Sequence, residues 1–230
     1  MAARKRPPAK KAGPKRGTAK NAGPARPYHH GDLREKLIAA TEALILERGV
    51  DGFSLREVAR RAGVSPAAPA HHFGDTKGLL SEVARLGFKD FGDALQEADR
   101  CGGDDPAKRL NAQGLAYVNF ALKNPARFTL MFRHGKYDMT NKELQDVAER
   151  SFHVLEDAIR AAQGLAPGAG MTSEAYGLLL ATWSIVHGFA HLALGGELDN
   201  AAQMRGGQDM ILKSFLPLAL KHLPIPTPHK

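Results

Sequence analysis

The spacing of apolar residues constrains the fold of this chain more than any other feature. From residue 29 onward, apolar side chains recur at a period near 3.6 residues, and no stretch alternates apolar and polar residues as a half-buried strand would. The sequence therefore predicts an all-α fold of about nine helices, three short ones followed by six others.

Capping residues and glycines predict where these helices begin and end. We expect the first helix to begin at Asp32 and end at Gly49, and the second to begin at Ser54, whose spacing to Glu57 is that of a capping box, and to end at Gly63. Pro66, preceded by Ser65 as N-cap, is expected to open a third helix that ends near Phe73. The six later helices are predicted at residues 76–99, 106–123, 125–133, 141–163, 173–194 and 201–222, with a kink at Pro217.

Positive charge is concentrated at the N-terminus. Residues 1–28 contain nine Lys and Arg and no acidic residue, whereas the rest of the chain contains 23 basic and 24 acidic residues. The segment is also rich in Pro, Gly and Ala, so we predict a disordered basic tail, with a second short tail at residues 225–230. Such a cationic arm attracts phosphate through counterion release, and its alternative role is that of a solubilising extension.

Composition excludes several classes of protein. The single cysteine, Cys101, excludes an internal disulfide framework and a Cys-cluster metal site. We find no apolar run of the roughly 20 residues that a membrane span needs and no secretion signal, so we expect a soluble, cytoplasmic protein that makes no membrane contact. The chain shows no Ser/His/Asp series, no paired-carboxylate motif and no phosphate loop, so we expect neither an enzyme nor a bound cofactor.

The second and third predicted helices have the pattern of a helix-turn-helix. A small Ala59 precedes the turn glycine Gly63 by four residues, and the apolar Val64 follows it. In that arrangement the third helix lies in the major groove of DNA. We predict phosphate contacts for Ser54 and Arg56, base-edge contacts for Ser65, Pro66, Ala67 and Ala68, and backbone contacts on the far side for His71, His72 and Lys77.

This segment resembles the DNA-binding signature of the TetR family. The resemblance is carried by Ser54-Leu-Arg-Glu-Val-Ala-Arg-Arg-Ala-Gly-Val-Ser65, then by His71-His72-Phe73 and by Leu79-Leu80. Tyr28-His29-His30-Gly31-Asp32-Leu33 and Trp183-Ser-Ile-Val-His187-Gly188 are similar to elements of one branch of that family, whose sensor domain carries a Trp-His-Gly element. The resemblance implies a helix-turn-helix DNA-binding domain at residues 29–76 and a six-helix ligand-binding and dimerisation bundle at residues 77–224.

Three residues depart from the family pattern. Pro69 and Ala70 stand where the family usually has a bulky apolar residue and then a tyrosine that touches phosphate, and Thr76 replaces the usual lysine, with Lys77 one position later. Pro66, Ala67 and Ala68 offer apolar contacts, such as with thymine methyl groups, rather than bidentate hydrogen bonds to bases. We expect the basic tail to compensate through phosphate or minor-groove contacts.

Aromatic residues suggest a binding site in the C-terminal half. TetR-like sensor domains hold small, often apolar ligands within the helical bundle. The dense aromatic segment from Tyr117 to Phe132, together with Trp183 and His187 as polar groups, is the predicted site. Its predicted ligand-binding residues are Tyr117, Phe120, Phe128, Met131, Trp183 and His187.

Simpler interpretations of these residues remain open. The aromatic and Met residues could form an ordinary core. Trp183, His187 and His191 share one helix face, but a metal site would need further ligands that the sequence does not place, so none is predicted.

The sequence therefore predicts a DNA-binding transcriptional regulator. We expect a homodimer that binds a palindromic operator in double-stranded DNA as a repressor, associates with the bacterial nucleoid, and is released by a small, mostly apolar effector. The alternative is a non-specific or architectural DNA-binding protein that acts mainly through its basic tail.

Overall fold

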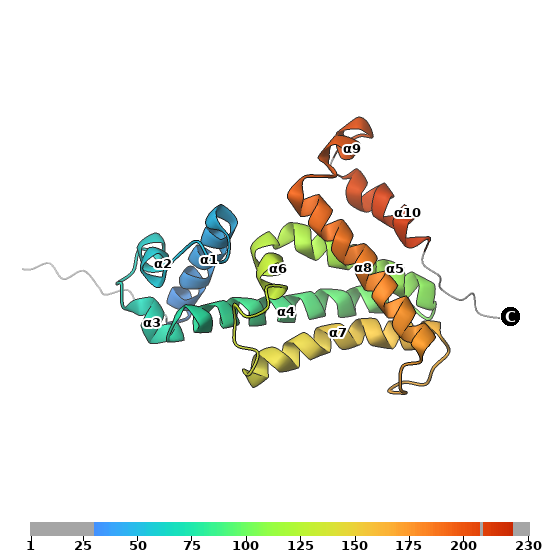
Figure 1. Cartoon of the computed structure of the whole chain (residues 1–230), viewed down its shortest axis with the longest axis horizontal. Coiled ribbons are helices and arrows are strands. Elements are labelled where there is room, and N and C mark those ends of the chain that lie inside the picture. Colours follow the sequence, from blue (N-terminus) through green and yellow to red (C-terminus); the bar gives the residue numbers. More distant parts are fainter. Residues whose placement is uncertain (1–29, 208, 223–230) are drawn as a thin grey trace, which may run out of the picture.

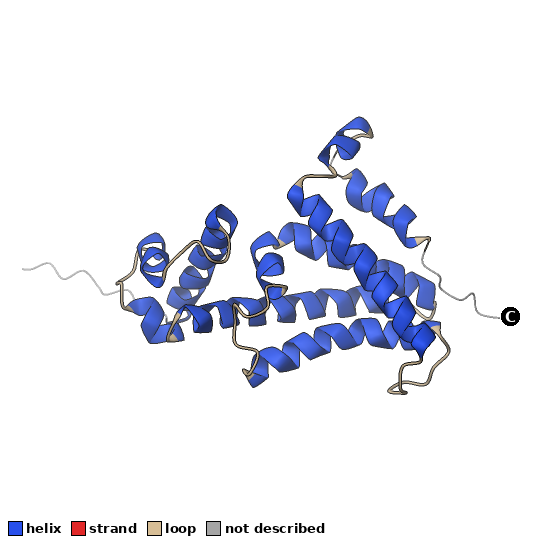
Figure 2. Ribbon diagram, viewed as in Figure 1, coloured by secondary structure: helices blue, strands red, loops and turns tan. Residues whose placement is uncertain are grey.

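The structure is a computed structural model that describes residues 30–207 and 209–222. Every regular element in these ranges is a helix, which confirms the predicted all-α class (Figure 2). The helices are α1 (His30–Arg48), α2 (Leu55–Ala62), α3 (Ala68–Phe73), α4 (Thr76–Cys101), α5 (Pro106–Lys123), α6 (Pro125–Met131), α7 (Lys142–Ala162), α8 (Ser173–Gly195), α9 (Asp199–Met204), the π-helix η1 (Ile211–Phe215) and α10 (Leu216–Leu220). The predicted tails at residues 1–28 and 225–230 lie outside the described residues.

Helices α1, α2 and α3 form a small unit at one end of the molecule (Figure 1). Leu37 and Leu44 of α1 pack with Val58 of α2 and with Leu79 of α4, and all four side chains are buried. The first turns of α4 therefore complete the core of this N-terminal unit, which ties the two parts of the chain together.

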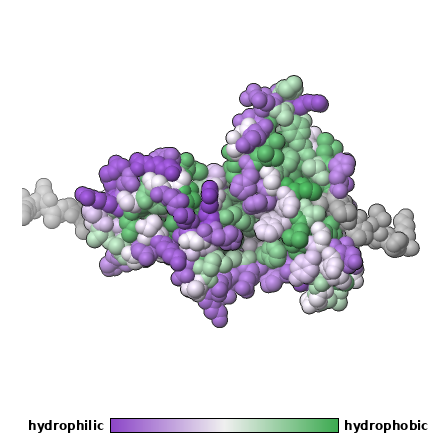
Figure 3. Space-filling view, viewed as in Figure 1, coloured by the Kyte–Doolittle hydropathy of each residue, from purple (hydrophilic) through white to green (hydrophobic). Residues whose placement is uncertain are grey.

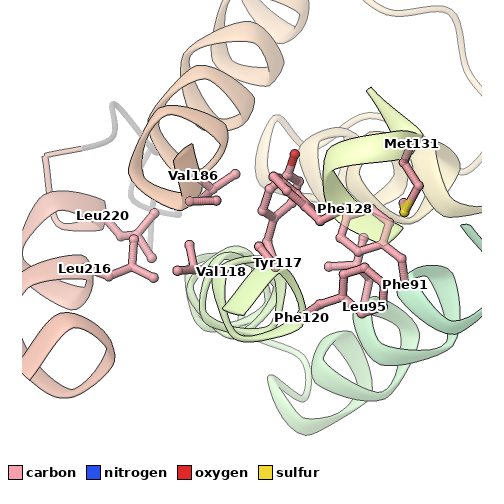
Figure 4. Packing of buried hydrophobic residues seen from close by; sticks show 12 residues of the cluster. Phe91, Leu95, Tyr117, Val118, Phe120, Phe128, Met131, Val186, Leu216 and Leu220 are labelled. Carbon is pink, nitrogen blue, oxygen red and sulfur yellow. The ribbon is translucent and has the colours of Figure 1, made fainter. Parts of the chain in front are cut away.

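The 26-residue helix α4 runs from this unit into the C-terminal bundle, where it lies against α5, α6 and α7 (Figure 1). Helix α8 packs across α5 and α7, and α10 packs against α5 and α8. The largest core of the bundle joins α4, α5, α6, α8 and α10 (Figure 4). Figure 4 shows Phe91, Leu95 and Phe120 on one side of Tyr117, with Val186 on the other.

Two predicted helix starts are displaced. Helix α1 begins at His30, so Asp32 lies in its first turn, where the carboxylate pairs with Lys36 at 2.8 Å. Helix α3 begins at Ala68 rather than at Pro66, because the amide of Ala68 bonds to the carbonyl of Ser65 at 3.0 Å and closes a separate turn.

The single last helix predicted at residues 201–222 is wrong. Gly206 and Gly207 adopt φ values of 115° and 106°, which an α-helix cannot contain, and the chain divides into α9 and a second segment. That segment begins as the π-helix η1 just before Pro217. Because proline lacks an N–H and its ring clashes with the carbonyl four residues earlier, the turn widens there instead of continuing as α-helix. The described part of the chain thus has ten α-helices and one π-helix, not nine.

Helix α8 is long and apolar enough to cross a membrane by length and composition, so the expectation that no segment qualifies is wrong on that count. Its contacts are those of a bundle helix. Leu178 and Leu179 are buried against α5 and α7, and Val186 and Ala190 are buried in the main core. Its other face carries exposed apolar side chains, among them Tyr176 and Leu180.

Candidate DNA-binding surface and sensor cavity

The capping box predicted at the start of α2 is confirmed. The Ser54 hydroxyl accepts a hydrogen bond from the amide of Glu57 at 3.4 Å, and the Glu57 carboxylate accepts one from the amide of Ser54 at 3.1 Å. Gly63 ends the helix in the left-handed conformation, with φ at 68°. The turn after Gly63 then carries the chain into α3, so the cap and the glycine together determine where α2 begins and ends.

Most of the predicted DNA-contacting side chains are available at the surface. Those of Ser54, Arg56, Ser65, Pro66, Ala67, His71 and Lys77 are exposed. Ala68 and His72 are half-buried, and Ala68 packs against the core of the N-terminal unit. Ser65, Pro66 and Ala67, which are exposed, lie in the turn before α3 rather than in the helix itself.

The four arginines on and near α2 fall into two groups. Arg48 pairs with Glu57, and Arg61 pairs with Glu47 at the end of α1; these hydrogen bonds hold the pKa of both carboxyls below their usual range. Arg56 and Arg60 are exposed and form no ion pair with any residue that the structure describes. Arg60 was not among the predicted contacts, although its spacing of four residues from Arg56 places both on one helix face.

The two departures in the recognition helix have different structural effects. Pro69 is buried, so it fills the inward position that a bulky apolar residue usually occupies. Ala70 is exposed and leaves a short, uncharged surface where the family pattern has tyrosine. The proline is therefore a packing substitution, whereas the alanine removes a polar group from the surface.

The C-terminal bundle contains a partly open cavity of about 170 Å³. Its wall is almost entirely apolar, and no charged side chain lines it. The lining residues are Phe88, Phe91 and Leu95 of α4; Leu110, Gln113, Gly114 and Tyr117 of α5; Phe132; Ala148, Ser151, Phe152 and Leu155 of α7; and Thr182, Trp183 and Val186 of α8. A cavity of about 150 Å³ with an apolar wall can hold a benzene-sized molecule, so this one suits a small ligand.

The structure divides the six predicted ligand-binding residues into two groups. Tyr117 and Trp183 line the cavity. Phe120, Phe128 and Met131 are buried in the core beside it, and His187 stands behind Tyr117. The aromatic segment at residues 117–132 thus lies beside the cavity, but most of its side chains pack against one another.

The cavity-lining residues that were not predicted from the sequence come mainly from α4 and α7. Phe88, Phe91 and Leu95 follow one another at intervals of three and four residues, the spacing of a single helix face. That spacing was a usable signal. What the sequence could not show is that this face of α4 and the face of α7 that carries Phe152 and Leu155 meet around an unfilled volume.

A small polar network supports Tyr117 at the cavity wall. Its hydroxyl lies 2.7 Å from Nδ1 of His187, and the indole N–H of Trp183 donates to the same oxygen at 3.4 Å. Burial raises the pKa of Tyr117, so the phenol stays neutral. Burial, and then the nearby His191, lower the pKa of His187, which favours a neutral imidazole whose Nδ1 can accept a hydrogen bond from the tyrosine hydroxyl.

His187 and His191 contact each other edge to face. Their ring centroids are 4.6 Å apart, and Phe128 lies against both. Within the residues that the structure describes, no group of three or more His, Cys, Asp or Glu could hold a metal ion.

Helix α6 connects the bundle to the N-terminal unit. Arg127 donates to Glu42 of α1 and to Asp90 of α4, both at 2.6 Å. Ala126 and Leu130 of α6 are buried in a cluster shared with α1 and α4, whereas Phe128 faces the main core of the bundle. One short helix therefore contacts both the N-terminal unit and the side chains around the cavity.

A helix-turn-helix joined through a long helix to a helical bundle defines a class, that of DNA-binding regulators. Residues 37–83 match the family model described as bacterial regulatory proteins, tetR family, and residues 110–213 match that of the tetracyclin repressor-like C-terminal domain. The chain belongs to the TetR family and is a DNA-binding transcriptional regulator, not an enzyme, and membership of this family implies a cytoplasmic protein.

Individual relatives agree with this assignment. The HTH-type transcriptional regulator BetI of Burkholderia ambifaria is 29% identical over 188 residues, covering 77% of this chain and 91% of the relative. A solved structure of a protein with unknown function from Rhodococcus sp. RHA1 is 32% identical, with a TM-score of 0.66 over 86% of this chain and 99% of that one. The TetR family transcriptional regulator PfmR from Thermus thermophilus shares the fold at 20% identity, with a TM-score of 0.60 over 80% of this chain and 97% of that one.

Proposed function

We propose that this TetR-family regulator is a repressor that leaves its operator when a small, mostly apolar ligand occupies the cavity of the C-terminal bundle. The observation that carries the proposal is the cavity itself, about 170 Å³ with no charged side chain in its wall. A concave, largely apolar site with a few polar groups is the usual form of a small-molecule binding site.

Helix α4 supplies the route from ligand to DNA. Phe88, Phe91 and Leu95 line the cavity, while Leu79 of the same helix is buried in the core of the N-terminal unit. A ligand that binds one position of α4 better than another shifts the population toward that position, and the recognition helix moves with it. We place the division between the DNA-binding and sensor parts at residues 76 and 77, the start of this helix.

We further propose that the protein acts as a homodimer through α8 and α10. Tyr176, Leu180 and Leu192 of α8 and Leu218 of α10 are large apolar side chains left exposed. Figure 3 shows hydrophobic surface gathered over this end of the molecule, whereas hydrophilic residues dominate the N-terminal unit. A two-fold dimer presents two recognition helices and so fits a palindromic operator.

In this proposal the predicted contacts meet double-stranded DNA as follows. Ser54, Arg56 and the newly identified Arg60 bind phosphate, the turn from Ser65 to Ala67 meets base edges, and His71, His72 and Lys77 reach the backbone on the far side. Ala68 has less surface to offer because it is half-buried. Binding of this kind associates the protein with the nucleoid.

We also assign the sensor domain to the branch of the family with a Trp-His-Gly element. Trp183 lines the cavity, and His187 hydrogen-bonds to Tyr117 at its wall, so both residues of the element act at the proposed ligand site. Gly188 has open space around its α-carbon, on the face of α8 proposed for the dimer.

A second function, non-specific DNA binding through the basic tail, is favoured by one observation, the exposed Ala70 in place of a polar side chain. Genome-wide footprinting of the full chain and of a chain lacking residues 1–27 separates the two. We expect discrete palindromic sites that survive the deletion, with lower affinity and a shallower salt dependence, because up to nine cations are removed. Diffuse binding that disappears with the tail would establish the second function instead.

A further inference from the structure

Gln113 of α5 is held in one orientation at the cavity wall. Its side chain is buried, and its amide nitrogen donates to Asp99 at 2.7 Å and to the carbonyl of Val154 at 3.3 Å. Asp99 is fixed in turn by two hydrogen bonds from Arg109, each 2.8 Å long. Rotating the amide would set its oxygen against two acceptors, so the network determines which end is nitrogen.

The oxygen of this amide is left without a partner. Gln113 Oε1 is the buried side-chain polar atom in the described part of the chain that has no hydrogen-bond partner. An unsatisfied buried acceptor costs free energy, and native proteins rarely keep one unless it has another use. Gln113 is one of the residues that line the cavity, and its nitrogen is committed to Asp99 and Val154, so a ligand in the cavity is a partner that this oxygen can take.

The hydrogen-bond donors of the other polar residues in the cavity wall already have acceptors. The hydroxyls of Ser151 and Thr182 donate to backbone carbonyls of their own helices at 2.7 and 2.8 Å. Tyr117 bonds to His187, and the indole N–H of Trp183 is directed to the Tyr117 oxygen. What the wall retains is the capacity to accept hydrogen bonds, and it holds no charge that could balance an ion.

We infer that the cavity selects an uncharged, largely apolar molecule with one hydroxyl or N–H group, and that this group donates a hydrogen bond to Oε1 of Gln113. The inference rests on the proposed function, since it names the chemistry of the same ligand site. It makes Gln113 the residue that determines specificity. Carboxylates are rejected, because a wall of acceptors repels them and nothing in it neutralises their charge.

Three probes of similar shape test this selection. 4-Ethylphenol carries a hydroxyl where 4-ethyltoluene carries a methyl group, and 4-ethylbenzoate carries a negatively charged carboxylate at that position. Trp183 is the sole tryptophan of the chain and lines the cavity, so its fluorescence, excited at a wavelength where the probes do not absorb, reports binding to the full-length protein. We expect the phenol to bind about tenfold more tightly than the hydrocarbon, and the benzoate not to bind.

Variants assign the preference to one residue. Gln113→Leu keeps a side chain of similar size but removes the acceptor, so the preference for the phenol should disappear and the more hydrophobic toluene should bind at least as well. Thr182→Val is the matched control, because the Thr182 hydroxyl also lies at the wall but already donates to Leu178. That variant should keep the preference for the phenol.

The outcomes separate this inference from the proposed function. Equal binding of phenol and hydrocarbon to the unaltered protein overturns the role of Gln113 and leaves the cavity as a ligand site. A preference that persists in Gln113→Leu also overturns it. Failure of every probe to change Trp183 fluorescence removes the ligand site itself, and with it the proposed release by a ligand, while binding to DNA is measured independently.

Discussion

His187 is a titratable group that contacts the wall of the apolar cavity through its hydrogen bond to Tyr117. The imidazole lies partly buried among Phe128, Phe132 and His191, and it accepts the tyrosine hydroxyl only in its neutral form. Protonation would add a charge in a mainly aromatic environment and reverse this bond, since Nδ1 would then donate to the tyrosine oxygen. The state of one side chain therefore affects the wall of the cavity.

The free energy of unfolding should decrease in mild acid because of His187. Its pKa is lower in the folded protein than in the unfolded chain, where a histidine titrates near 6.5, so the unfolded chain takes up the proton first. This contribution is complete above about pH 6.5 and is lost as pH falls toward the folded value. Urea denaturation at pH 7.5, 6.5 and 5.5 measures it.

Two variants isolate this effect. His187→Asn should show a smaller loss of stability between pH 7.5 and 5.5 than the parent. His134→Asn, at an exposed position in the loop after α6, should behave as the parent does. Identical pH dependence of the parent and His187→Asn would contradict the assignment.

Ser54 has a structural role and a proposed DNA contact, which can be separated. Ser54→Ala removes the cap of α2 and should lower the free energy of unfolding by about 1 kcal/mol. Thr172→Ala removes the equivalent cap of α8, where the hydroxyl accepts from Ala175 at 3.2 Å, at a similar cost. If Ser54 also binds phosphate, its variant alone should weaken binding to operator DNA, measured by fluorescence anisotropy. Equal DNA affinity in the two variants would leave Ser54 only its capping role.

At the scale of helices, α6 contacts both the N-terminal unit and the side chains around the proposed ligand site, so it is placed to couple the two. Arg127→Met removes both ion pairs, to Glu42 and to Asp90, at a cost of about 1 kcal/mol because the groups are partly solvated. We expect this variant to bind operator DNA but to lose much of the release caused by ligand, as measured by anisotropy with and without 4-ethylphenol. Arg160→Met is the control, since Arg160 pairs with Glu156 and Asp157 within α7. A normal response in Arg127→Met would leave α4 as the route.

Helix ends were predictable where a single residue determines them. Pro106 and Pro125 open α5 and α6 at the predicted positions, because proline suits the first helical turn and an Asp or Asn precedes it. The Gly206-Gly207 break was missed, since a glycine within a helical pattern is often tolerated. The cavity was predicted only in part, because aromatic density at residues 117–132 indicates burial but not which side chains leave space unfilled.

At the scale of the whole molecule, the exposed face of α8 and α10 is the proposed dimer interface. Leu180 and Leu218 are each 54% exposed, so a glutamate at either position is tolerated in a monomer but places a charge in the proposed interface. Leu180→Glu should sediment as a monomer at micromolar concentration and lose affinity for a palindromic operator. Leu46→Glu, at a side chain 59% exposed on α1, should remain dimeric. A monomeric parent protein would remove the proposed interface.

The cavity also has a consequence for the lifetime of the protein in the cell. Side chains around an unfilled volume lack packing partners, so the empty bundle is less stable than a filled one. A ligand that binds the folded chain alone raises its stability in proportion to the logarithm of ligand concentration. Because proteases degrade the unfolded fraction, a ligand that releases the proposed repressor would also slow its turnover, and the regulator would accumulate while its target genes are expressed.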